Sequence, residues 1–292
     1  MRRFLYWFLA VIITIGAAYF QRKTGPTYPK IIIAQINGKA YDLKLVRSLG
    51  LNQRPEVKLA VTDTSVKAKL YFKRFPSNDE YQPVDFSYRI YPVNSAFMNK
   101  VFHIYEEKGF FAEVPKQPAA GKIQYYFEVT DSNGTRTYLK ESPVVIRFKG
   151  SVPDWVLMPH ILCMFLAMLF STLAGLMTIG KYKTFRKYSA WTVVLLFIGG
   201  MCLGSVVQYY AFGKFWTGIP FGWDVTDNKT LIALIFWILA VWMNRKKERP
   251  LYVAVAAIVV LLVYSIPHSL LGSQINYQSG QMTQGIILSL FS

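Results

Sequence analysis

Long apolar runs at both ends of the chain, separated by a more polar stretch, set its overall plan. The runs cover residues 4–20, 154–179, 188–212, 231–244 (extended back to about 228) and 251–266. A helix needs about 20 apolar residues to cross a bilayer, and each run approaches or exceeds that length. The pattern therefore predicts five membrane helices, one at the N-terminus and a bundle of four in the second half of the chain.

Residues 28–150 differ from these runs, because polar and apolar positions alternate there in short segments. The period of two that half-buried strands require recurs at residues 67–74, 84–90, 110–114, 122–129 and 143–148. Asp131-Ser-Asn-Gly134 has the composition of a tight hairpin turn between two strands. Evenly spaced short strands over about 100 residues predict an antiparallel β-sandwich. Residues 31–47 can add a strand pair, and His103 is predicted at a surface position on a strand.

Composition and charge predict the orientation of the chain in the membrane. The chain is 53% hydrophobic and has a formal net charge of +17, which in a soluble protein favours a nucleic-acid partner. Here many basic residues instead flank the apolar runs, where the positive-inside rule retains them in the cytoplasm. They are Arg2, Arg3, Lys181, Lys183, Arg186, Lys187, Arg245, Lys246, Lys247 and Arg249. We therefore expect a bacterial inner-membrane protein with a cytoplasmic N-terminus, a periplasmic β region and no nucleic-acid partner.

The ends of the chain leave alternatives open. The first apolar run also fits a secretory signal peptide with Ala17-Ala18 as its cleavage site, but its length favours a retained anchor. At the other end, residues 274–281 are too polar for a membrane span and residues 286–291 are too few. This tail is compatible with a strand or with a short interfacial helix.

Few residues offer catalytic chemistry. Cys163 and Cys202 both lie in apolar runs, so the sequence has neither a disulfide framework nor a Cys-x-x-Cys-His motif for covalent heme attachment. It also lacks a Ser-His-Asp order, a phosphate-binding glycine loop and a pair of acidic residues at hydrolase spacing. The sequence gives no indication that the chain is an enzyme by itself.

Two Pro-His pairs are the first candidates for a site. Alternation of the helices brings Pro159-His160 and Pro267-His268 to the outer side, with His160 about 10 Å inside its helix end. Ionisable side chains in membrane segments usually face a bundle interior, so His160 and His268 can supply the two axial nitrogens of heme b or two ligands of a metal. The structural alternative is that each histidine forms hydrogen bonds at a helix end, where the prolines also fit.

An aromatic, glycine-rich loop at residues 212–229 is the second candidate. Trp216 and Trp223 offer flat apolar faces for a planar macrocycle, and its glycines permit close backbone approach. The alternative is an interfacial aromatic belt with Thr226 or Asp227 as a helix cap. Capping by these residues leaves Asp224 unexplained.

A copper site on the second helix is a further alternative. Its sulfur and imidazole groups suit Cu(I) and are spaced within three turns. The set is Met158, His160, Cys163, Met164 and Met168. Methionine is also a common packing residue of membrane helices.

Two segments resemble known families. The segment AEVPKQPAAGKIQYYFEVTDSNGTRTY resembles immunoglobulin-like or fibronectin type III-like modules of bacterial envelope proteins, which implies a fold but no function. The Trp-Asp loop and the helix after it resemble the heme-handling proteins of cytochrome c biogenesis. The matching positions are Trp216, Trp223, Asp224, Leu231, Ile232, Trp237 and Arg245, with His160 and His268 as flanking histidines.

This second resemblance implies a heme site. His160 and His268 are then axial ligands of heme b, and Trp216, Trp223 and Asp224 enclose the cofactor edge. In that family the acidic residue after the Trp-Asp pair is followed by Thr and a further Trp, whereas this chain has Asp227-Asn228-Lys229. It also has fewer helices and an outer β-sandwich.

The expected architecture is an all-β Ig-like sandwich inserted between an N-terminal membrane helix and a C-terminal four-helix membrane bundle. Its parts are an anchor (1–24), a periplasmic sandwich (25–150), the bundle (151–270) and an outward-facing tail (271–292). Two functions follow: a membrane subunit for heme handling or electron transfer, or a non-catalytic envelope subunit whose Ig-like domain binds a protein partner.

Overall fold

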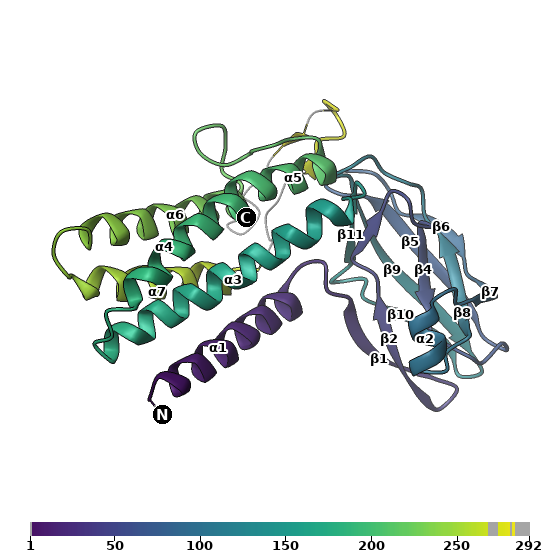
Figure 1. Cartoon of the computed structure of the whole chain (residues 1–292). Helices are drawn as coiled ribbons and strands as arrows, with labels where there is room; N and C mark the ends of the chain where they lie inside the picture. The colour runs from purple at the N-terminus through teal and green to yellow at the C-terminus, as the bar shows by residue number, and fades with distance from the viewer. Residues whose placement is uncertain (1, 268–273, 281, 284–292) are drawn as a thin grey trace. The chain divides into compact units, whose positions relative to one another are not determined.

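The computed structural model describes residues 2–267, 274–280 and 282–283, which form two compact units (Figure 1). The β unit contains residues 27–150 and the described part of 275–282. The helical unit contains the described parts of 1–26, 151–274 and 283–292. The predicted combination of a β-rich domain with long apolar helices is therefore confirmed.

Residues 27–150 of the β unit form two sheets and a separate hairpin. The six-stranded sheet has the order β3-β11-β9-β5-β6, with β10 pairing with β9, and the three-stranded sheet has the order β4-β8-β7. Within these two sheets the pairs are antiparallel except β3 with β11, and among the described residues β1 pairs with β2 alone. The bounds are β1 Lys30–Ile36, β2 Lys39–Leu45, β3 Ser48–Gly50, β4 Glu56–Leu59, β5 Lys67–Arg74, β6 Gln82–Asp85, β7 Ser87–Pro92, β8 Glu106–Glu113, β9 Lys122–Asp131, β10 Gly134–Tyr138 and β11 Val144–Lys149.

The alternating sequence of these strands forms one core. Leu70 in β5 and Phe127 in β9 are fully buried from the six-stranded sheet, and Leu59 in β4 and Phe110 in β8 join the same cluster from the other sheet. Alternate side chains of each strand thus point into a common apolar layer, as the period of two predicts.

The local patterns predicted most of these strands but not all. The β5 strand has the predicted bounds, and the hairpin turn lies between Asp131 and Gly134. The single strand predicted at 84–90 is wrong, because the chain changes sheets there. The backbone N–H of Phe86 donates to Ala68 O (2.9 Å), and the two sides become β6 and β7.

The strand predicted around His103 is also wrong. The segment begins with the short helix α2 (Ala96–Val101), whose N-cap Ser95 accepts a hydrogen bond from Met98 N. His103 follows this helix outside any strand, with a φ of 52°, although its exposed position agrees with the prediction. Capping by Ser95 favours the helix over the extended conformation that the alternation predicted.

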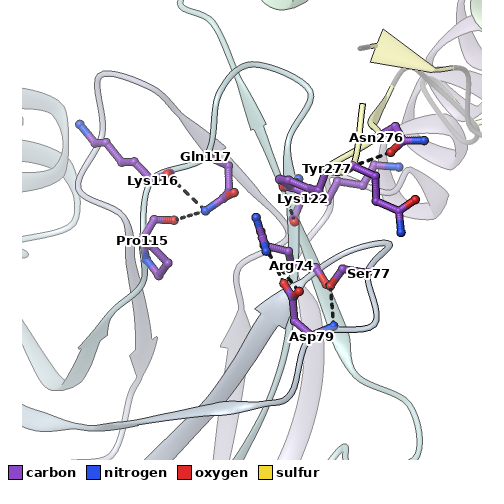
Figure 2. Close-up of polar contacts among 10 residues, drawn as sticks. Arg74, Ser77, Asp79, Pro115, Lys116, Gln117, Lys122, Asn276 and Tyr277 are labelled. Atoms are coloured by element: carbon purple, nitrogen blue, oxygen red, sulfur yellow. Dashed lines mark hydrogen bonds and ion pairs between the residues drawn. The ribbon is translucent and has the colours of Figure 1, made fainter. Parts of the chain in front are cut away.

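Part of the C-terminal tail belongs to the β unit. The strands β12 (Gln274–Ile275) and β13 (Met282–Thr283) pair, so the described part of this tail contains strands. Between them Tyr277 reaches β9: its hydroxyl donates to Lys122 O (2.8 Å) and accepts from Lys122 N (2.9 Å), as Figure 2 shows. The Arg74 guanidinium lies 5.2 Å from the centre of the Tyr277 ring and also pairs with Asp79.

The described residues of the helical unit form five long helical segments. They are α1 (Arg2–Thr24), α3 (Asp154–Ile179), the continuous helix of α4 (Phe185–Leu195), η1 (Leu196–Leu203) and α5 (Gly204–Phe212), α6 (Val225–Met243) and α7 (Pro250–Ser265). Among the described residues, four helices are long and apolar enough to cross a membrane: Arg3–Thr24, Asp154–Ile179, Phe185–Phe212 and Val225–Met243. The apolar helix α7 has 16 residues and falls below that length, so a fifth span stays a prediction.

The basic segments of this unit meet at one end of the bundle. Arg3 of α1 lies over the ring of Tyr182, 5.0 Å from its centre, in the connection between α3 and α4. In the same connection Lys183 lies 4.0 Å from Glu248, which belongs to the connection between α6 and α7. The other end therefore carries the start of α3, the start of α6 and the loop before α6.

Candidate functional site

His160 lies in the second turn of α3 and contacts a backbone carbonyl of a neighbouring helix. Its Nδ1 is 2.8 Å from Gly199 O, in the π-helical segment η1. Because a carbonyl oxygen only accepts hydrogen bonds, the proton of this bond belongs to Nδ1. In the neutral imidazole the lone pair is then on Nε2, which is the arrangement of most metal-binding histidines.

The π-helical segment creates this contact. Gly199 O also accepts a hydrogen bond from the N–H of Gly204, five residues later, and π-turns often occur at functional sites. A Cβ at Gly199 would lie 2.6 Å from Cβ of Cys163, so only glycine permits this approach of α3. A Cβ at Gly204 would lie 3.5 Å from Cε1 of His160, in ordinary contact with the imidazole.

His268 lies outside the described residues. The prediction that His160 and His268 share a cofactor is therefore not tested by any distance between the two imidazoles. Among the described residues, no group of three or more His, Cys, Asp or Glu side chains is arranged to hold a metal ion. In the copper set, Met158 is exposed and Met168 is buried, so these two sulfur ligands differ in environment.

The structure explains Asp224 as the N-cap of α6. Its buried carboxylate accepts hydrogen bonds from Thr226 N (2.8 Å) and Asp227 N (3.3 Å). The interpretation that capping leaves Asp224 unexplained is wrong, because α6 begins at Val225, before the residues expected as caps. A carboxylate at this position also interacts favourably with the helix dipole.

Asp227 and Asn228 hold the preceding loop against the first turn of α6. Oδ2 of Asp227 accepts from Thr217 N (2.6 Å) and Thr217 Oγ1 (3.1 Å). Oδ1 of Asn228 accepts from Ile219 N (2.7 Å). Gln208 of α5 donates to Thr217 Oγ1 (2.6 Å), so the loop is tied to the helices on both sides of it.

The two tryptophans of the loop have different surroundings. Trp216 is half-buried, and its indole N–H donates to Ile219 O within the same loop (3.1 Å). Trp223 is exposed. Their contact with a cofactor edge, like that of Asp224, stays a prediction.

Lys229 is a buried charged residue that the sequence argument did not single out. Its Nζ donates to Ile266 O, just after the end of α7 (2.8 Å). A further polar contact lies deeper, where Tyr264 of α7 donates to Met164 O of α3 (3.2 Å). The signal for Asp227 and Lys229 was present in the sequence, because charged side chains in a membrane segment are costly and need partners.

The β unit carries a group of exposed apolar side chains on and after α2. Phe97 and Phe102 contact each other edge to face, with ring centres 5.6 Å apart. Both are exposed, and the neighbouring exposed side chains are Val101, Ile104 and Tyr105. Contiguous exposed apolar side chains are typical of binding surfaces. We call residues 97–105 the α2 surface.

Comparison with known proteins adds no relative: no family model, no curated protein and no solved structure matches this chain.

Proposed function

We propose that this chain is a bacterial inner-membrane subunit whose helical unit carries a periplasm-facing heme b site with His160 as an axial ligand. The observation that carries this proposal is the hydrogen bond between His160 Nδ1 and Gly199 O. It fixes the ring orientation and leaves Nε2 as the metal-binding nitrogen, and such a bond also raises the basicity of a ligating imidazole.

The proposed topology has a cytoplasmic N-terminus and a periplasmic β unit. Its support is the meeting of Arg3, Tyr182, Lys183 and Glu248 at one end of the bundle, together with the other basic residues of both connections. The positive-inside rule assigns this end to the cytoplasm. His160 and the Trp-Asp loop then belong to the periplasmic end, and α7 is the fifth membrane helix.

We further propose that the β unit is an Ig-like or fibronectin III-like module. Two mostly antiparallel sheets that bury one common core support this fold. Such a module is compatible with many functions, so the heme proposal depends on the helical unit alone.

The chain contributes orientation and packing to this proposed site, whereas heme iron, when bound, supplies one-electron chemistry. His160 would provide one ligand nitrogen to the heme, and His268 would provide the other. Asp224, Asp227 and Asn228 accept backbone hydrogen bonds in and beside the loop, so they constrain the backbone that carries Trp216 and Trp223.

Heme titration of the purified full chain tests this proposal. Wild-type protein in mild detergent is expected to bind hemin stoichiometrically and to develop a Soret band. His160→Ala should lose this band, whereas His103→Ala, at an exposed position of the β unit, should retain it. A folded wild-type protein that binds no hemin would contradict the proposal, as would an unchanged spectrum of His160→Ala.

The α2 surface favours a second function, a non-catalytic envelope subunit that binds a protein partner through its β unit. Phe97 and Phe102 present two adjacent aromatic rings to solvent, and aromatic residues are enriched at the centres of protein interfaces. In this alternative the helices anchor the assembly in the membrane.

Co-purification from native membranes tests the second function. The double variant Phe97→Ser/Phe102→Ser should lose a defined partner that wild-type protein retains. Ile33→Ser changes an equally exposed apolar residue of β1 and serves as the matched control. A wild-type protein that is monodisperse and free of partners in mild detergent argues against this function.

A further inference from the structure

The loop between α5 and α6 exposes its large apolar side chains and buries its charged anchoring groups, which is the opposite of what is expected of a loop in water. Its polar anchoring groups, Asp224 and Asp227, are 5% and 6% exposed. Its large apolar side chains face outward, with Phe221 80% and Trp223 74% exposed. Soluble loops normally show the opposite distribution, because buried charges need compensating contacts and exposed aromatic surface is unfavourable in water.

Hydrogen bonds keep this arrangement in place. The α5 helix ends at Phe212, and the next residue, Gly213, has a φ of 75° and caps the helix through a bond from its N–H to Tyr209 O (2.7 Å). Asp224 N then donates to Thr217 O (3.1 Å), and Phe221 N donates to Gly218 O (2.9 Å). Together with the carboxylate of Asp227, these bonds fix the backbone from which the aromatic side chains project.

We infer that the outer surface of this loop, formed by Phe215, Ile219, Phe221 and Trp223, lies in the interfacial layer of the lipid bilayer. The loop connects the span Phe185–Phe212 directly to the span Val225–Met243, so it is at a membrane face. The helix that follows the loop, α6, also exposes apolar side chains, among them Ile232 and Ile235.

The chemistry of the loop surface identifies lipid as the occupant. Aromatic side chains, tryptophan above all, concentrate at the level of the lipid headgroups, where an apolar ring and a polar neighbour are both accommodated. The exposed Lys214 in the same loop suits the headgroup phosphates. The surface therefore acts as a rigid anchor that fixes the depth of α5 and α6, a role independent of heme binding at His160.

Spin labels measure this depth directly. The full chain, with Cys163→Ala and Cys202→Ala as background, is labelled at Phe221→Cys or Trp223→Cys and reconstituted in phosphatidylcholine–phosphatidylglycerol nanodiscs. Phe197→Cys, exposed within the span, is the lipid control, and Asn133→Cys, in the turn between β9 and β10, is the water control. The readout is collision with oxygen relative to collision with a water-soluble nickel chelate.

We expect the oxygen-to-nickel ratio at positions 221 and 223 to exceed that of the water control several-fold and to fall below that of the lipid control. A ratio equal to the water control overturns the inference, and so does low access to both reagents, which indicates a covering protein or cofactor. Quenching by brominated lipids gives an independent readout without cysteine variants. Trp223→Phe should remove a quenchable part of the wild-type emission, and an unchanged quenched fraction also overturns the inference.

Discussion

The contact between Tyr277 and β9 can be weakened by the removal of one oxygen atom. In Tyr277→Phe the ring remains available to Arg74, but both hydrogen bonds to the backbone of Lys122 are lost. Figure 2 shows these residues together with Asn276, which begins the turn that contains Tyr277. The change therefore isolates the hydroxyl from the packing of the side chain.

The expected loss of free energy in this contact follows from the two hydrogen bonds that are removed. A neutral hydrogen bond contributes about 0.5–1.5 kcal/mol, and a buried donor that loses its acceptor costs about 1–3 kcal/mol. We expect the contact to weaken by about 2 kcal/mol, which corresponds to roughly a 30-fold larger fraction of the open state at about 1.4 kcal/mol per factor of ten. Burial raises the pKa of Tyr277, so the hydroxyl remains protonated and able to donate throughout neutral pH.

Hydrogen exchange at the Lys122 amide is the appropriate assay, because Tyr277 accepts from that N–H. Exchange there should accelerate by about the same factor in Tyr277→Phe. Tyr105→Phe removes a hydroxyl from an exposed tyrosine of the same unit and should leave it unchanged. Equal exchange at Lys122 in wild type and Tyr277→Phe, with the fold intact, would refute the reasoning.

Three further predictions concern charge and topology. Hydrogen bonds from Ser65 and Asn37 lower the pKa of Asp63 to about 2. The stabilising contribution of the Asp63 carboxylate is therefore present above pH 3.8 and is lost as the pH falls through 2. In Asn37→Gly an NMR titration should find the pKa of Asp63 nearer 3.8. Burial, with repulsion from a nearby arginine, lowers the pKa of Lys122 to about 7. The unfolded chain therefore binds more protons between pH 7 and 10.5, so stability should rise with pH there, and thermal unfolding of Lys122→Met should show a smaller rise. A membrane-impermeant maleimide applied to intact cells should label Asn133→Cys but not Lys183→Cys, and the reverse pattern contradicts the proposed topology.

The parts of the fold that the sequence predicted are those that local pattern determines. Alternation within one strand is enough for β5, and the Asp-Ser-Asn-Gly composition is enough for the turn after β9. The apolar run of α3 likewise ends where the structure ends the helix, at Ile179. In each case the evidence lies within the element itself.

The parts of the fold that the sequence did not predict depend on contacts between segments distant in sequence. Phe86 divides a continuous alternating run because its N–H pairs with Ala68 in another strand. The tail segment around Tyr277 joins a strand that begins more than 150 residues earlier, at Lys122. Alternation describes which face of a strand is buried, but it does not specify the sheet to which the strand belongs.

In the candidate site, too, local sequence predicted one residue but not the distant group that it contacts. His160 is a candidate site residue from the sequence, because an imidazole in an apolar helix needs a partner. Its partner is the carbonyl of Gly199, whose position depends on the wider turn of η1. No residue type signals that turn, since Gly199-Gly200 also fits ordinary close packing of helices.

Asp227 and Asn228, in the first turn of α6, hold the loop that precedes this helix. Asp227 and Asn228 accept the backbone N–H groups of Thr217 and Ile219, and Lys229 donates to Ile266 O. Apolar residues at 227 and 228 leave both amides without these acceptors, at about 1–3 kcal/mol for each donor that is buried. The loop conformation of this chain therefore depends on the side chains of Asp227 and Asn228. In the Trp-Asp pair at the end of this loop, Asp224 caps α6 and Trp223 faces outward.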